Sequence, residues 1–107
     1  MSGSGASFDN GPTATNSSCS TLIFDTQLTS PKADIVSQLS IDDILTVELH
    51  QANQNTVVCA KWRGQIAGGV ASEYLRKLRS CLEQGQKYNA KVTSIQAGQV
   101  RVRVYPV

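Results

Sequence analysis

The sequence is poor in the residues from which most metal sites and general-base catalysts are built. Among its 107 residues there is one histidine, His50, and the three cysteines, Cys19, Cys59 and Cys81, form no C-x-x-C pair. A zinc site needs several nitrogen and sulfur ligands, and a Ser-His-Asp triad needs a histidine base. We therefore expect no enzyme, no metal site and no cofactor.

The cysteines are also odd in number and far apart along the chain. Cys59 and Cys81 fall on apolar faces of the elements that the sequence predicts. This pattern favours buried free thiols over a disulfide framework.

Two further features of the sequence indicate where the protein is located and which part of it is disordered. No run of about 18 apolar residues could cross a membrane, and no basic segment followed by an apolar one comes after Met1. Residues 1–20 are rich in Gly, Ser, Thr and Asn, with Phe8 as their only aromatic residue, which is typical of a disordered tail. The sequence thus predicts a soluble cytoplasmic protein, without a membrane partner, whose residues 21–107 form a single globular domain.

The clearest periodicity lies in residues 72–84, where an amphipathic helix is predicted. Ser72 is a suitable N-cap, and Gly85 suits the end of a helix. Apolar residues recur at the helical period and form one stripe that must face a core. The residues of this stripe are Tyr74, Leu75, Leu78, Cys81 and Leu82.

From residue 88 onward the period changes to two, which predicts a β-hairpin. A three-residue loop at 96–98, with Gly98 in the left-handed conformation, sets its register. The expected inner pairs are Val92 with Val102 and Ala90 with Val104, and the expected outer pairs include Lys91 with Arg103.

The segments before the helix complete the expected fold. Residues 21–28, 44–50, 56–62 and 65–67 have strand-like patterns, and residues 33–39 could form a short helix. The sequence predicts an α+β fold, with a small, strongly bent antiparallel sheet or partly closed β-barrel of five to six strands and one main helix at 72–84.

Charge is distributed unequally along the chain. Residues 1–60 hold one lysine against six acidic residues, whereas residues 61–107 hold nine basic residues against two acidic ones. This asymmetry indicates an anionic partner for the second half, or two halves that complement each other across the fold.

The outer face of the hairpin and the polar face of the helix carry the candidate binding residues. Like charges placed opposite each other destabilise a sheet, and a phosphate backbone would compensate them. Tyr105 could stack on a base. The alternative is a solvated face that protects a sheet edge from aggregation. The candidate nucleic-acid-binding residues are Arg76, Arg79, Lys91, Arg101, Arg103 and Tyr105.

Trp62 and Arg63 are a second candidate surface, because they lie at a predicted hairpin tip next to Gly64. An exposed Trp there could anchor a partner. Trp62 shares a strand face with Val58 and Ala60, which favours core packing.

Four motifs follow one another in the region of residues 55–94. They are a strand that begins with asparagine (NTVVC), a glycine unit (QIAGG), a helix with three spaced leucines, and the strand AKVTSI. This order resembles the C-terminal part of HIRAN domains. The resemblance implies a small bent β-barrel with a helix, and a module without catalysis that grips the 3′ end of single-stranded DNA. Residues 52–54 read Ala-Asn-Gln where the family usually has a Tyr-Asp pair, so no pocket residue is carried over.

Two functions remain open from the sequence. The first is a non-enzymatic binding module that contacts single-stranded nucleic acid through the basic hairpin and helix face. The alternative is a protein-interaction or adaptor domain, with the capacity to form a homo-oligomer, that uses a strand edge or the Trp62 tip. A small ligand-binding barrel is a minor third hypothesis.

Overall fold

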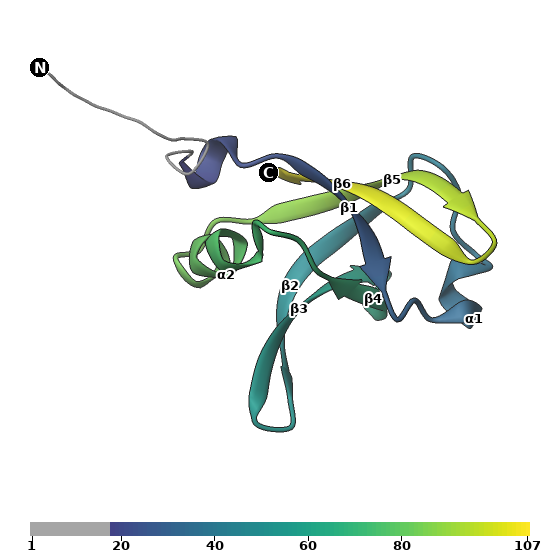
Figure 1. The fold of residues 1–107 in the computed structure, drawn as a ribbon, viewed down its shortest axis with the longest axis horizontal. Coiled ribbons are helices and arrows are strands. Elements are labelled where there is room, and N and C mark those ends of the chain that lie inside the picture. Colours follow the sequence, from purple (N-terminus) through teal and green to yellow (C-terminus); the bar gives the residue numbers. More distant parts are fainter. Residues whose placement is uncertain (1–17) are drawn as a thin grey trace, which may run out of the picture.

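The structure is a computed structural model that describes residues 18–107. Residues 1–17, most of the predicted tail, lie outside the described residues. The elements in chain order are the 3-10 turn η2 (Cys19–Thr21), β1 (Phe24–Thr29), α1 (Ala33–Val36), β2 (Ile44–Ala52), β3 (Asn55–Trp62), β4 (Gln65–Val70), α2 (Leu75–Glu83), β5 (Tyr88–Gln96) and β6 (Gln99–Pro106) (Figure 1).

The six strands pair antiparallel and close into a ring in the order β1-β4-β3-β2-β5-β6. The helix α2 packs against η2 and β2, and α1 is a short helix beside β4. In Figure 1 the hairpin formed by β2 and β3 projects beyond the rest of the ring. The predicted α+β fold is confirmed in part: the main helix is present, but the described domain is mostly sheet.

The core fills the inside of the ring because the strands bury alternate residues. In β1 the residues from Phe24 to Thr29 alternate between buried and exposed, and in β6 Val100, Val102 and Val104 are fully buried. Leu78 of α2 is also fully buried. Each such aliphatic side chain stabilises the fold by roughly 1.5–3 kcal/mol, so the predicted valine layer and leucine stripe are the main source of stability.

The β5–β6 hairpin confirms the inner pairs expected from the sequence. Val92 lies opposite Val102 and Ala90 lies opposite Val104. All four side chains are fully buried.

The loop of this hairpin differs from the prediction. It has two residues, Ala97 and Gly98, which both have positive φ values of 51° and 80°. The pairing shifts between Val92 and Ser94, which leaves Thr93 as the extra residue of a β-bulge. The predicted three-residue loop was therefore wrong, and the bulge restores the same inner register.

The helix α2 begins later than predicted. Ser72 lies in the turn that precedes it, where the Tyr74 N–H donates to the Ser72 hydroxyl at 2.8 Å and the Leu75 N–H donates to the Ser72 carbonyl at 3.1 Å. Ser72 accepts hydrogen bonds from backbone N–H groups near the start of the helix, as expected. However, Ser72 lies in the turn before the helix and not at the N-cap position.

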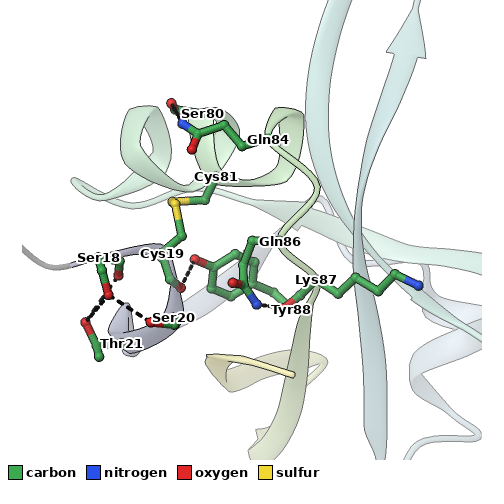
Figure 2. Close-up of a disulfide and its surroundings, with 10 residues drawn as sticks. All are labelled: Ser18, Cys19, Ser20, Thr21, Ser80, Cys81, Gln84, Gln86, Lys87 and Tyr88. Carbon is green, nitrogen blue, oxygen red and sulfur yellow. Dashed lines mark hydrogen bonds between the residues drawn. A yellow bond between two sulfur atoms is a disulfide. The ribbon is translucent and has the colours of Figure 1, made fainter.

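The prediction that free thiols are favoured over a disulfide was wrong for Cys81. Cys19 and Cys81 form a disulfide that joins η2 to α2, with the two Cα atoms 5.4 Å apart and a sequence separation of 62 residues. Figure 2 shows this bond and the Tyr88 hydroxyl, which donates to the Cys19 carbonyl at 2.5 Å. The sequence did not reveal the pair because Cys19 lies in a segment without periodicity. Cys59 is free and buried, as predicted.

Gly68 and Gly69 lie within β4, which extends beyond the strand predicted at residues 65–67. A Cβ atom at Gly69 would lie 2.5 Å from the Thr29 hydroxyl oxygen, and one at Gly68 would lie 3.0 Å from the Thr29 carbonyl oxygen. The two glycines therefore allow β1 to approach β4 closely where the ring closes.

Among the helices of residues 18–107, none has the length and apolar character needed to cross a membrane.

Candidate functional site

The outer face of β5 and β6 carries its cations next to carboxylates from the first half of the chain. Arg103 donates to both carboxylate oxygens of Asp25, at 2.8 and 3.2 Å. The hydrogen bond from Arg103 lowers the pKa of Asp25 below its ordinary value of 3.8, and the positive charges of Arg103 and Arg101 add to this effect. Asp25 is placed there because β1 pairs with β6.

Lys91 is also compensated. Its ammonium nitrogen lies 3.4 Å from a carboxylate oxygen of Asp42. Lys91 and Arg103 do face each other as predicted, but each has its own acidic neighbour. Their repulsion therefore needs no bound phosphate, and Arg101 is the one candidate of this face without a salt bridge among the described residues.

The remaining nucleic-acid candidates lie on other elements or at the end of the hairpin. Arg76 is exposed and Arg79 half-buried on α2, and neither forms a salt bridge within residues 18–107. Tyr105 is half-buried opposite Asn89 near the end of β6.

Trp62 belongs to the core, with 9% of its surface exposed. The guanidinium of Arg63 lies 4.4 Å from the centre of the Trp62 ring, a cation–π arrangement. Arg63 therefore covers the tryptophan, and Trp62 has little surface to offer a partner.

The projecting β2–β3 hairpin has strand edges that no other strand of residues 18–107 covers. Near its tip, within these residues, β2 and β3 pair only with each other: β5 follows β2 as far as Val47, and β4 follows β3 as far as Cys59. In the described chain no strand lies beside Thr56 on the side of β3 away from β2.

The direction of the backbone groups at Thr56 follows from the hairpin geometry. The hairpin closes with a two-residue turn between Ala52 and Asn55, and the pair that flanks such a turn is hydrogen-bonded. Hydrogen-bonded pairs alternate with open ones along an antiparallel ladder. The N–H and C=O of Thr56 therefore point away from β2, and we term this position the open β3 edge.

A cavity of about 480 Å³ runs along the open β3 edge. Thr56, Val57 and Val58 line it from β3, and Leu75 lines it from α2. Val57 is 42% exposed, which is unusual for a valine in a strand. We term this cavity the basic groove, because Lys32 and Arg79 are among the residues that line it.

The rim of the basic groove carries Lys32, His50 and Arg79, which come from three different elements or their connections. None of the described residues that line the groove is acidic. Lys32 and Arg79 also have no salt-bridge partner within the described residues. The groove therefore combines apolar walls with uncompensated positive charge.

Cys59 also lines the groove but is only 2% exposed. Burial raises the pKa of its thiol above the ordinary value of 9.0. A protonated, covered thiol is a poor nucleophile.

The second open edge of the hairpin, along β2, borders another cavity of about 560 Å³. Its lining includes both Glu48 and Lys87, and Glu48 already pairs with Lys61 at 3.3 Å. The two cavities therefore differ in charge, and only the basic groove is uniformly positive.

Sequence reasoning identified Arg79 but missed Lys32 and the groove itself. Lys32 follows Pro31 in a connection, and His50 is the last residue of the strand predicted at residues 44–50. The signal that could have drawn attention to the groove is Val57, an apolar residue on the same strand face as His50.

The chain matches no family model, no curated protein and no solved structure.

Proposed function

We propose that this protein is a non-enzymatic protein-interaction module that receives an extended segment of a partner along the open β3 edge. The observation that carries the proposal is the unpaired backbone of Thr56 beside a cavity with apolar walls. A strand edge with free N–H and C=O groups pairs readily with another chain, and an adjacent cavity can select its side chains.

The hairpin is suited to this role because the ring supports its base. The pairs from Thr46 to Ala52 of β2 with Asn55 to Lys61 of β3 form one continuous ladder, and the inner residues Val47 and Ala60 are buried in the core. The edge thus continues a strand ladder whose base is anchored in the core, which lowers the entropic cost of ordering it on binding.

Blocking each edge with proline tests the proposal. Thr56→Pro removes the N–H that points out from the open β3 edge. Gln51→Pro is the matched control, because Gln51 pairs with Thr56 and directs its N–H out from the opposite edge. The two variants also lose the same exposed hydrogen bond, from the Thr56 hydroxyl to the Gln51 side chain.

The probe is a library of random eight-residue peptides displayed in extended form. We expect wild type and Gln51→Pro to enrich common sequences and Thr56→Pro to enrich none, with all three folded by circular dichroism. The proposal fails if wild type enriches no peptide, or if Thr56→Pro retains the peptides that wild type selects. Sedimentation that revealed a dimer closed through this edge would also overturn it, in favour of self-association.

A second candidate function is binding of single-stranded nucleic acid by the helix face. Arg76 and Arg79 favour it, since both lack salt bridges in the described part of the chain. A labelled oligonucleotide titrated at two salt concentrations should then bind more weakly to Arg76→Ala/Arg79→Ala and show a shallower salt dependence. Equal binding by wild type and this variant would reject the helix face.

The proposal also concerns the cellular compartment in which the protein works. The sequence predicts the cytoplasm, but disulfides persist mainly in oxidising compartments. The Cys19–Cys81 bond favours such a compartment, and trapping of free thiols in whole cells, followed by mass spectrometry, would decide between the two.

A further inference from the structure

We infer that the segment bound along the open β3 edge is acidic and carries aliphatic side chains as well as Asp or Glu. This inference rests on the proposed function and specifies its partner. It follows from the charge and shape of the basic groove.

Charge is the first argument. The rim holds Lys32 and Arg79 and also His50, and the groove has no acidic lining residue among residues 18–107. Of the eight other lysines and arginines, three (Lys61, Lys91 and Arg103) already pair with acidic residues. Complementary charge at an interface selects partners and increases the association rate.

The position of these cations relative to the strand edge is the second argument. Arg79 comes from α2 and Lys32 from the connection before α1, so two separate segments bring positive charge to the groove beside β3. A segment lying in the groove would meet both cations.

The apolar walls of the basic groove favour aliphatic side chains in the bound segment. Val57 is 42% exposed, and Leu75 is half-buried on the helix side. These apolar residues lie next to the polar ones, since Val57 pairs with His50 and Leu75 is one helical turn from Arg79 on α2. A segment that carries both aliphatic and carboxylate side chains therefore fits the groove.

A nucleic acid fits the groove less well. Single strands bind proteins through stacking of bases on aromatic rings as well as through phosphate contacts. No Phe, Tyr or Trp side chain lines the groove within residues 18–107. A nucleic acid also has no amide groups with which to extend a β-ladder.

Charge reversal tests the inference. The test variant is Lys32→Glu/Arg79→Glu, and the matched control is Lys87→Glu/Arg101→Glu, which makes the same change of charge away from the groove. The probe is the library of random eight-residue peptides. Peptides are selected against each protein, and the affinity of each protein for the peptide that wild type enriches most is then measured.

We expect wild type and the control to enrich acidic peptides, and the top peptide to bind the test variant at least about tenfold more weakly than the control. Selected peptides that lack acidic residues, and that still need Thr56, would overturn this inference while the proposed function stands. The absence of any enriched peptide would overturn both. Displacement of the peptide by an equal concentration of a short single-stranded oligonucleotide would overturn it in favour of a nucleic-acid ligand.

Discussion

Gly69 and Thr29 illustrate how single residues determine the closure of the ring. They lie opposite each other where β1 pairs with β4, and this contact has only two paired positions, Leu28 with Val70 and Thr29 with Gly69. A side chain at position 69 would meet the Thr29 hydroxyl oxygen at 2.5 Å. The space beside Gly69 is thus already occupied by its partner strand.

Gly69→Ala should lower the free energy of unfolding by about 1–3 kcal/mol, because one strand must shift to admit the methyl group. Urea denaturation measures this loss. Thr29→Ala in the same protein removes the clashing oxygen and should restore most of the stability. If the double variant is no more stable than Gly69→Ala alone, the clash with Thr29 is not the cause.

Asp25 and Arg103 form the best-defined ion pair of the ring. Both side chains are about half exposed, 47% and 57% respectively, so solvent screens much of their attraction. The pair also joins β1 to β6 at an outer position of their ladder. Its contribution is therefore small at neutral pH, but it depends on pH in a defined way.

We expect the stability difference between wild type and Asp25→Asn to be constant above about pH 5 and to shrink below it. The reason is that the pKa of Asp25 is lower in the folded protein than its ordinary value of 3.8. Protons therefore bind the unfolded chain more readily, and the advantage of wild type is lost as pH falls through the folded pKa. Thermal unfolding from pH 2.5 to 7 measures this, and a difference that grew on acidification would contradict the assignment.

At the scale of elements, η2 is held to the domain by a few specific bonds. The disulfide ties Cys19 to α2, and the buried Tyr88 at the start of β5 donates to the Cys19 carbonyl. Leu22, just after η2, is 4% exposed and joins the core. The N-terminal end of the described chain is thereby fixed against the helix.

Cys19→Ala/Cys81→Ala should unfold with about 2–4 kcal/mol less stability, because the bond closes a long loop in the unfolded chain. Its sequence separation is 62 residues. The same loss should occur in wild type after reduction, and reduction should leave the double variant unchanged. A reduced wild type that unfolds at the same denaturant concentration as the oxidised protein would show that the bond does not stabilise this fold.

Two elements show what sequence could and could not predict. The α2 stripe was found because a period of 3.6 is a local property of the chain, and Leu78 and Cys81 are indeed fully buried. The β5–β6 loop was assigned wrongly, because a bulge at Thr93 and a two-residue turn give the same inner pairs as a longer loop without a bulge. Alternating hydrophobicity reports which residues face inward, but it does not locate an extra residue.

At the scale of the whole molecule, the strand order could not be read from local patterns. β1 joins β6 and β4, and these are contacts between residues far apart in sequence. The same long-range pairing places Asp25 beside Arg103, and it accounts for why the outer hairpin face is less available to phosphates than its sequence suggested. The open β3 edge likewise depends on where β4 leaves β3, which no local pattern specifies.

The open β3 edge explains several features of the molecule together. The hairpin extends past its neighbours, Val57 is exposed, and uncompensated cations gather along one of its two edges. A module that binds an extended acidic segment would need each of these features at this place.

The most direct test is the hydrogen exchange of the Thr56 amide, measured by NMR with and without the peptide that wild type selects from the library. In the free protein this amide should exchange fast, because no acceptor lies opposite it. With the peptide at saturation its exchange should slow by about tenfold or more, whereas the outward amide of Gln51 on the opposite edge should remain fast. Unchanged exchange at Thr56 while the peptide is bound would contradict strand addition at this edge.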